Sequence, residues 1–264
     1  MKSLSLIPLS LVAAGAFAVT VPMPGSMATD GNSTLISTPK GTVMVTPVSP
    51  DIFRVSQIPT GVAAMSFPKS QSAIMPEQDF PVSSFATGTE FVISTPSTIL
   101  RVNRLTGKIT FENAEGKTLL TEAGGVDNAG MIKTATFVTP ADVSFYGAGE
   151  RGHSFRLNGD SLTMWNRPTY GYGAGDGRIN QMNITMPVIL AENGFALLFD
   201  DYNRASLSIT DTIKYQSETQ KPLSYYFING DGSLAGAAAN YATLTGRQDL
   251  PPFWTLGYIT SKYG

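Results

Sequence analysis

The sequence predicts an all-β fold, a sandwich of two stacked sheets, followed by one helix and one further strand. Three observations predict it. Short segments of strand composition recur from Leu35 onwards, separated by turns that use many of the 26 glycines and 17 prolines. No amphipathic pattern of helical period precedes residue 233. Apolar residues make up 42% of the 264 residues, which is enough for a packed core in one large or two small domains.

Charge and composition exclude several classes of function. The net charge is −2, so there is no basic surface for nucleic acid or for an anionic membrane. The chain has no cysteine, which excludes disulfides, a thiolate nucleophile and a zinc–thiolate site. It has one histidine, His153, which excludes a multi-histidine metal site. We therefore expect no metal, no cofactor and no nucleic-acid partner.

The N-terminus has the pattern of a secretory signal peptide. Residues 4–18 are apolar, follow a positively charged start and end in an Ala-Phe-Ala cleavage pattern. A buried strand or a membrane anchor is the alternative. The apolar run is shorter than the roughly 20 residues of a spanning helix, and Pro8 interrupts it. We expect residues 1–18 to be a signal peptide, residues 19–34 a flexible tether, and the protein to be secreted or periplasmic without a membrane span.

Residues 35–232 form the predicted sandwich domain. Gly107 and Gly116 supply the positive φ that tight turns between antiparallel strands often need. Residues 62–88 are rich in proline and serine and indicate irregular structure. Alternating or β-branched residues predict strands at 42–46, 51–58, 89–95, 98–103, 109–112, 118–122, 135–138, 162–164, 181–185, 188–191, 195–200, 205–209 and 223–228.

Gly147-x-Gly149-x-x-Gly152 matches the dinucleotide-binding fingerprint as a string. That fingerprint needs a helix that begins at its third glycine, so that the helix N-terminus faces the pyrophosphate. No helical periodicity follows here, and Asn158-Gly159 indicates a turn. We therefore predict a tight bend between strands and no nicotinamide cofactor. For the neighbouring Glu150 and Arg151 an ordinary ion pair is the default interpretation.

Residues 165–180 contain four glycines, three aromatic residues, two arginines and one aspartate. As an ordered loop, this segment presents flat rings and hydrogen-bond donors, the groups that hold sugars. The alternative is a surface loop whose Trp165 returns to the core, and for Trp165 we favour the core because an indole buries a large area. Functional and structural roles stay equally open for Tyr170, Tyr172, Asp176 and Arg178.

The pair Asp200-Asp201 follows the apolar run 195–199. Glycoside hydrolysis uses two carboxylates that flank one bond. Adjacent residues on a strand, however, point to opposite faces. We therefore predict a turn at the end of a strand rather than a catalytic pair.

Residues 233–252 predict a linker helix and a break after it. Ser233 is a candidate N-cap, residues 234–245 carry five alanines, and Gly246 is a candidate stop before Pro251-Pro252. Residues 253–264 are apolar. They predict a buried strand of a parallel sheet, which is not stable as a lone strand.

Four groups of segments, in this order, resemble the N-terminal part of glycoside hydrolase family 31, the α-glucosidase and α-xylosidase family. The resemblance covers about residues 40–264. It implies a galactose-mutarotase-like β-sandwich, a linker helix, and the first strand of a (β/α)8 barrel that is truncated in this chain. The segments are 104–111 with 115–120, Phe-Tyr-Gly-Ala-Gly-Glu-Arg at 145–151, Met-Trp-Asn at 164–166 with 186–190 and 194–200, and 241–264.

The resemblance also implies an exported retaining α-glycosidase that acts on α-linked gluco- or xylo-oligosaccharides. Its two catalytic aspartates would lie on later barrel strands, so no catalytic residue is assigned here, and we expect the chain to be inactive without the missing barrel. Tyr263 matches the aromatic residue that lines the pocket for the reacting sugar, at the carboxyl end of a barrel strand. The segment 165–180 matches the loop that leans over the cleft, with Tyr172, Asp176 and Arg178 as substrate-binding residues.

Two other functions are compatible with a sandwich of this kind. The first is a stand-alone carbohydrate-binding module. The second is a mutarotase that uses a histidine and an acid, for which the sequence offers one histidine, His153, and no clear acidic partner.

Overall fold

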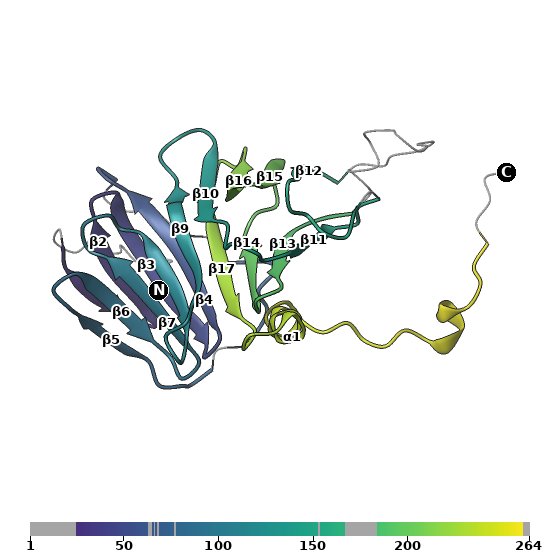
Figure 1. Ribbon diagram of the computed structural model, residues 1–264, viewed down its shortest axis with the longest axis horizontal. Helices are drawn as coiled ribbons and strands as arrows, with labels where there is room; N and C mark the ends of the chain where they lie inside the picture. The colour runs from purple at the N-terminus through teal and green to yellow at the C-terminus, as the bar shows by residue number, and fades with distance from the viewer. Residues whose placement is uncertain are drawn as a thin grey trace, which may run out of the picture.

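The structure, a computed structural model, describes residues 25–62, 65, 67, 69–76, 78–152, 154–166 and 184–260. Two antiparallel sheets lie face to face, and the helix α1 lies beside one of them (Figure 1). This arrangement confirms the predicted β-sandwich followed by one α-helix. Among the described residues no helix has the length and apolar content to span a bilayer.

The first sheet has eight strands in the described part of the chain. Its central strand β17 lies between strands that are far away in the sequence, so the sheet joins the two ends of the domain. In spatial order the strands are β1 (Met27–Asp30), β2 (Ser33–Thr38), β3 (Gly41–Ser49), β4 (Ile52–Pro59), β17 (Ser224–Asn229), β14 (Phe195–Phe199), β13 (Thr185–Ala191) and β11 (Phe145–Gly149).

The second sheet has nine strands within the described residues and is largely a meander. Glycines at the predicted turns do have positive φ, 72° at Gly107 and 80° at Gly116. In spatial order the strands are β12 (Ser161–Met164), β15 (Ala205–Ile209), β16 (Thr212–Ser217), β10 (Lys133–Val138), β9 (Thr118–Asp127), β8 (Ile109–Asn113), β7 (Thr98–Asn103), β6 (Glu90–Ser94) and β5 (Ser83–Ala86).

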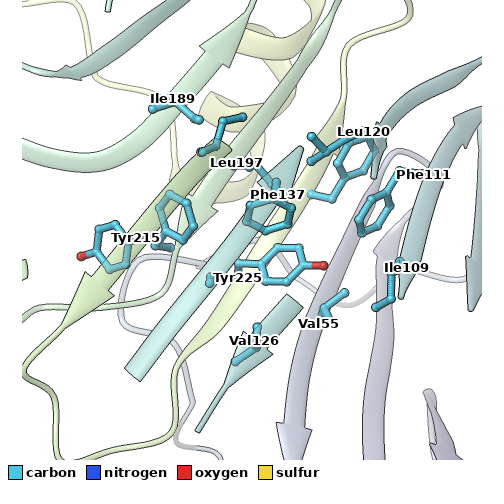
Figure 2. Close-up of a cluster of buried hydrophobic side chains, with 14 of the residues drawn as sticks. Val55, Ile109, Phe111, Leu120, Val126, Phe137, Ile189, Leu197, Tyr215 and Tyr225 are labelled. Atoms are coloured by element: carbon cyan, nitrogen blue, oxygen red, sulfur yellow. The ribbon is translucent and has the colours of Figure 1, made fainter. Parts of the chain in front are cut away.

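Aromatic rings from both sheets fill the space between them (Figure 2). Phe111 of the second sheet stacks on Phe227 of the first, with ring centroids 4.0 Å apart. Phe199 and Tyr215 form a second stacked pair at 4.2 Å. Offset stacking adds to the burial of such rings, so these pairs fix the two sheets against each other.

A buried carboxyl group also joins the two sheets. Glu122 of β9 is 3% exposed and accepts hydrogen bonds from the Tyr225 hydroxyl (2.7 Å) and the Ile109 amide (3.0 Å). Burial raises the pKa of Glu122 to about 7, while these two hydrogen bonds and the charge of Lys40 act in the opposite direction. The same burial, with the neighbouring carboxyl, raises the pKa of Tyr225, so its hydroxyl stays a donor.

The helix α1 (Leu234–Thr245) has the predicted ends. The Ser233 hydroxyl accepts a hydrogen bond from the Gly236 amide at 3.0 Å, and Gly246 ends the helix with φ of 94°. Ala237 and Leu244 are buried against side chains of the outer face of the first sheet, including Tyr226 and Ile228 of β17. The helix therefore covers the face of β17 that points away from the other sheet.

Two predicted boundaries are wrong within the described residues. Part of the expected tether 19–34 belongs to the sandwich, because β1 pairs with β2 and Leu35 and Ile36 are buried. β1 is a strand of four mostly exposed residues at a sheet edge and carries no alternating pattern, which is why the sequence did not indicate it. The expected irregular segment 62–88 likewise contains β5 at its end. The expected signal peptide, residues 1–18, lies outside the described residues.

The buried strand expected in residues 253–264 is not formed in the described part of that range, residues 253–260. Phe253–Leu256 forms a 3₁₀ helix, and the side chains of Phe253, Trp254 and Tyr258 are 90%, 77% and 94% exposed. A strand needs the N–H and C=O groups of a neighbour. In the described part of the chain no strand lies beside this segment, which extends away from the sandwich (Figure 1).

Candidate functional site

A cavity of about 550 Å³ opens where β12, β13 and the turn after β14 meet. This volume lies in the range of pockets that hold small ligands. Aromatic, amide and charged side chains share its wall with apolar ones. The lining residues are Met164, Trp165, Asn166, Thr185, Pro187, Asp201, Tyr202, Asn203, Arg204 and Tyr215.

This cavity lies at the root of the segment that the sequence singled out. The Asn166 side-chain oxygen accepts hydrogen bonds from the backbone amide of Thr185 and from its hydroxyl, the latter at 2.8 Å. These hydrogen bonds hold Asn166 and Thr185 together at one point of the surface, on either side of that segment. The predicted site residues Tyr172, Asp176, Arg178 and Tyr263 all lie outside the described residues, as do Tyr170 and His153.

Trp165 is not in the core, contrary to our expectation. The residue is 42% exposed, and the Arg204 guanidinium lies over its ring, 4.7 Å from the centroid. The reason is that β12 ends at Met164, which is 3% exposed and takes the buried position. The next side chain is therefore placed on the rim. A cation over an indole is attractive, so Arg204 orients the ring at the mouth of the cavity.

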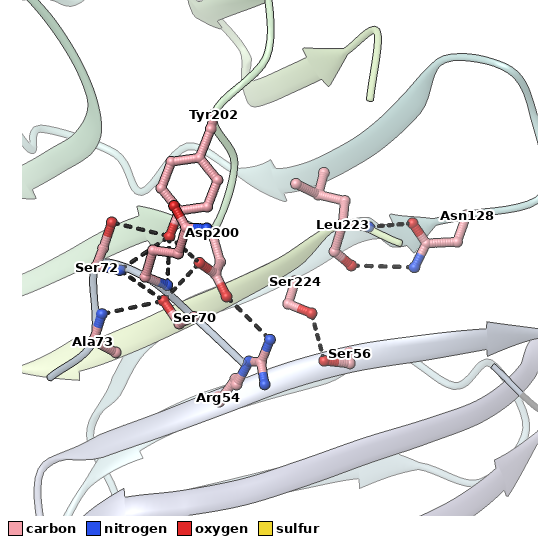
Figure 3. A network of polar contacts seen from close by, with 11 residues as sticks. Arg54, Ser56, Ser70, Ser72, Ala73, Asn128, Asp200, Tyr202, Leu223 and Ser224 are labelled. Carbon is pink, nitrogen blue, oxygen red and sulfur yellow. Dashed lines mark hydrogen bonds and ion pairs between the residues drawn. The ribbon is translucent and has the colours of Figure 1, made fainter. Parts of the chain in front are cut away.

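The turn that carries Tyr202, Asn203 and Arg204 is anchored on its outer side (Figure 3). Asp200 forms an ion pair with Arg54 at 3.0 Å, with side chains only 4% and 15% exposed. The Ser70 hydroxyl donates to the other Asp200 oxygen at 2.7 Å. The Tyr202 hydroxyl accepts from the backbone amides of Gln71 and Ser72 at 2.8 and 2.9 Å.

The inner side of the same turn is held by Asp201. One carboxylate oxygen accepts from the Tyr215 hydroxyl at 3.0 Å, and the other accepts from the Asn203 amide and side chain at 3.1 and 2.9 Å. Burial and this carboxylate raise the pKa of Tyr215, so its hydroxyl remains protonated and donates. Asp200 and Asp201 thus bind different partners on opposite sides, which confirms the predicted strand-end turn and excludes a pair around one bond.

Tyr202, Asn203 and Arg204 are cavity residues that the sequence analysis did not identify. They follow an apolar run and combine a ring, an amide and a guanidinium, the same mixture that drew attention to 165–180. Only the sheet brings the two segments together. β12 pairs with β15 so that Met164 lies opposite Ala205, which places Trp165 beside the turn that precedes β15.

The glycines of the segment 145–151 let the neighbouring strands β11 and β13 approach closely beside Thr185. Contrary to the expected bend, β11 is an edge strand with an irregularity between Gly147 and Gly149 in its pairing to β13. Gly149 has φ of 89°, and a Cβ there would lie 2.4 Å from the Ile184 carbonyl oxygen. The Arg151 guanidinium donates to the Ala148 carbonyl at 2.8 Å. Among the described residues after Gly152, no helix begins before α1.

Comparison with known proteins identifies the family. Residues 42–207 match the family model of the glycosyl hydrolase 31 N-terminal galactose mutarotase-like domain. The α-xylosidase XylQ of Lactiplantibacillus pentosus is 31% identical over 127 residues, which are 46% of this chain and 16% of that protein. The α-glucosidase 2 of Bacillus thermoamyloliquefaciens is 22% identical over 218 residues, 81% of this chain and 27% of that protein. The chain thus spans only a minor part of these curated relatives.

Solved structures share the fold. A glycoside hydrolase family 31 dextranase of Flavobacterium johnsoniae, complexed with isomaltotriose, has a TM-score of 0.77 at 20% identity, over 88% of this chain and 29% of that one. A family 31 α-xylosidase from a soil metagenome, complexed with xylose, has a TM-score of 0.67 at 17% identity, over 84% of this chain and 34% of that one. By sequence match and by fold, the chain belongs to the glycosyl hydrolase 31 family, as its N-terminal galactose mutarotase-like domain.

Proposed function

We propose that this chain is the N-terminal portion of an exported retaining α-glycosidase that hydrolyses α-linked gluco- or xylo-oligosaccharides. The family match over residues 42–207 is the observation that carries the proposal. Matched relatives are named as an α-xylosidase and an α-glucosidase. In a retaining reaction one carboxylate attacks the anomeric carbon and a second protonates the leaving oxygen. Both groups would lie on a catalytic barrel that follows this domain, so the domain alone would be inactive.

In this proposal the sandwich supports the barrel and lines the substrate cleft. Residues 250–259 expose a series of large apolar side chains, and Leu250, Trp254 and Ile259 are 89%, 77% and 68% exposed. A contiguous exposed apolar surface favours burial against a partner. Residues 253–264 would become the first barrel strand once neighbouring strands are present, with Tyr263 lining the pocket of the reacting sugar. Tyr172, Asp176 and Arg178 would contact the substrate from the sandwich side.

The test compares this chain with the same chain extended by any coding sequence downstream of Gly264 in its gene. We expect the extended protein to hydrolyse an aryl α-glucoside or α-xyloside, and the 264-residue chain to be inactive. Backbone amides at 254–259 should exchange slowly only in the extended protein. Hydrolysis by the highly purified 264-residue chain would contradict the proposal. Export has its own test: N-terminal sequencing of the secreted protein should show that it begins just after Ala18.

A stand-alone carbohydrate-binding module is the second candidate. The cavity beside Trp165 favours it, because the described part of the domain forms this cavity from its own side chains. The two candidates differ in the coding sequence expected downstream of Gly264. A gene that ends at Gly264, without a barrel-coding region, would support the binding module and would contradict the glycosidase.

A further inference from the structure

We propose that Glu122 and Lys40 form a proton-controlled latch at the joint between the two halves of the second sheet. When Glu122 loses its proton, the Lys40 ammonium leaves the Gly124 carbonyl and pairs with the new carboxylate. The latch goes beyond the proposed glycosidase function, because it involves no group that would bind or cleave a sugar. It rests on the course of β9, on a buried carboxyl group and on the position of Lys40.

β9 joins the two halves of the second sheet at Glu122. Residues 118–121 of this strand pair with β8, whereas residues 122–127 pair with β10. The register of the second pairing shifts between Glu122 and Gly125, so residues 123 and 124 have no partner on β10. A bulge of this kind leaves its extra residues outside the ladder of hydrogen bonds. At this point, therefore, other groups must hold the backbone of β9.

The Glu122 carboxyl group holds the joint from the inside. It is 3% exposed and accepts hydrogen bonds from the Ile109 amide of β8 and from the Tyr225 hydroxyl of β17. The backbone of Gly125 packs directly on it, since a Cβ at this glycine would lie 2.9 Å from a carboxyl oxygen of Glu122. One side chain thus contacts both halves of the second sheet and the sheet that faces them.

Lys40 holds the same joint from the outside. It lies in the turn between β2 and β3 of the first sheet, and its ammonium donates a hydrogen bond to the Gly124 carbonyl at 3.0 Å. The Lys40 carbonyl accepts a hydrogen bond from the Gln57 side chain at 3.1 Å, which ties the turn to β4. An ammonium group thus takes the place of a strand partner at a bulged residue.

A narrow cavity separates Lys40 from Glu122. It measures about 10 Å³, roughly the volume that one water molecule needs, and both residues line it. Among its described lining residues only these two carry charge. The Tyr225 hydroxyl stays neutral, because burial and the carboxyl group raise its pKa. Residues 124 and 125 are glycines, so no side chain of the bulge blocks the path of the ammonium to the carboxyl group.

Ionisation of Glu122 changes the partner that Lys40 favours. Burial raises the pKa of Glu122 to about 7, while its two hydrogen bonds and the charge of Lys40 lower it. Below that pH the carboxyl group is neutral and offers Lys40 no ionic partner. Above it the proton passes to the solvent, and a buried carboxylate is costly unless a cation lies beside it. Pairing with the Lys40 ammonium offsets part of this cost.

The latch would change the charge of a groove on the surface. This groove has a volume of about 550 Å³ and shares Lys40, Gly124 and Gly125 with the narrow cavity. Its charged residues, within the described part of the chain, are Lys40, Lys214 and Asp127. When Lys40 turns inward above about pH 7, one cation and one carboxylate remain. The groove would therefore lose its excess of positive charge as the pH rises.

The experiment is a nuclear magnetic resonance titration of the 264-residue chain, labelled with carbon-13, from about pH 5 to 8.5. We expect three signals to change together with one midpoint near pH 7: the Glu122 carboxyl carbon, the Gly124 carbonyl carbon and the Lys40 carbon next to the nitrogen. Glu122→Gln keeps the shape of the side chain but cannot ionise. In this variant the Gly124 and Lys40 signals should show no step near pH 7.

Lys40→Met distinguishes the latch from a direct effect of the carboxylate on its neighbours. Without the ammonium, the Glu122 midpoint should move to higher pH, and the step at Gly124 should be lost. Lys117→Met, at an exposed lysine before β9, is the matched control and should leave both unchanged. An equal step at Gly124 in Lys40→Met would overturn the latch, as would the absence of a step at Gly124 or Lys40 in the unmodified chain. Because Lys40 is exposed, its variant keeps the test valid even if Glu122→Gln fails to fold.

Discussion

Two apolar segments of similar composition, β17 and residues 253–259, differ in their surroundings: one is buried and the other is exposed. β17 carries two tyrosines, a phenylalanine and an isoleucine, and all its residues are buried. Residues 253–259 carry a phenylalanine, a tryptophan, a leucine, a tyrosine and an isoleucine, and Phe253 and Tyr258 are 90% and 94% exposed. One segment is the centre of a sheet, and the other is a short 3₁₀ helix and an extended tail.

The difference lies in the surroundings of each segment. β17 pairs with β4 on one side and β14 on the other, and it has a packed layer on each face. Phe227 points into the core between the sheets, whereas Tyr226 and Ile228 lie under α1. Residues 253–259 have no such neighbours in the described part of the chain. Strand composition alone is therefore insufficient, and pairing and burial decide the structure.

The largest difference in stability between the two segments should appear when one phenylalanine of each is replaced in turn. Phe227 is fully buried, 4.0 Å from the Phe111 ring and 5.8 Å from the Phe195 ring. Phe227→Ala should lower the free energy of unfolding by about 3–5 kcal/mol, because it leaves a cavity among these rings. Phe253→Ala should change it by less than about 0.5 kcal/mol, because no packing is lost. Urea denaturation measures both, and equal effects would show that residues 253–259 are packed.

The second test uses the carboxyl group that β17 binds in the core. Tyr225 donates to Glu122, whose pKa rises through burial from 4.5 to about 7. Between these values the folded protein keeps a proton that the unfolded chain has lost, so stability should fall as pH rises from about 4.5 to 7. The expected loss is on the order of 3 kcal/mol.

Glu122→Gln keeps the shape of the group but cannot ionise, so it should remove most of this pH dependence. The matched control is Glu115→Gln, an exposed glutamate at the β8–β9 turn, which should leave the pH profile unchanged. Urea denaturation at about pH 4.5, 6 and 8 gives the comparison. A wild-type profile that is flat over this range would show that Glu122 is ionised in the fold.

The sequence predicted the sandwich where local signals and the fold agree. The strand β7 alternates between buried and partly exposed residues, and α1 has both a capping serine and a terminal glycine. It failed where tertiary contacts override the local pattern. β11 contains three consecutive residues of positive φ, at Gly147, Ala148 and Gly149, so nothing in its composition indicates a strand. β16, Thr212–Ser217, is short and has only two large apolar residues, Ile213 and Tyr215, and its pairing with β10 and β15 defines it.

The candidate site was predictable only in part. The sequence pointed to the segment after Trp165 because rings, arginines and glycines occur there together. It could not show that Asn203 and Arg204 lie beside Trp165, since about forty residues separate them and the β12–β15 pairing that joins them is a long-range property. It also placed Trp165 in the core, because residue type alone does not show where a strand ends.

An intermediate loss of stability is expected when the ion pair that links β17 to the turn beside the cavity is removed. Arg54 binds Asp200 at 3.0 Å and lies over the Tyr226 ring of β17, 5.8 Å from the centroid. Asp200→Ala would leave this mostly buried guanidinium without its carboxylate and should cost about 2 kcal/mol of stability. The contrasting pair Arg204–Glu218 is about half exposed on both sides, so Glu218→Ala should cost less than about 1 kcal/mol. Thermal unfolding at low and high salt measures both, and a larger effect at the exposed pair would contradict this assignment.

The smallest effect concerns the helix that covers β17 and leads to the exposed segment. The Ser233 hydroxyl accepts a hydrogen bond from the Gly236 amide, so Ser233→Ala should lower the free energy of unfolding by about 1 kcal/mol. Ser233→Asn keeps a capping oxygen and should lower it much less. Hydrogen exchange should be faster in the first turn of α1 in Ser233→Ala. Amides at 254–259 should exchange fast in every variant, because their 3₁₀ turn is exposed and no strand lies beside it in the described part of the chain. If the loss of the cap changed exchange at 254–259, the exposed segment would be coupled to α1, and the contrast with β17 would be one of degree rather than of kind.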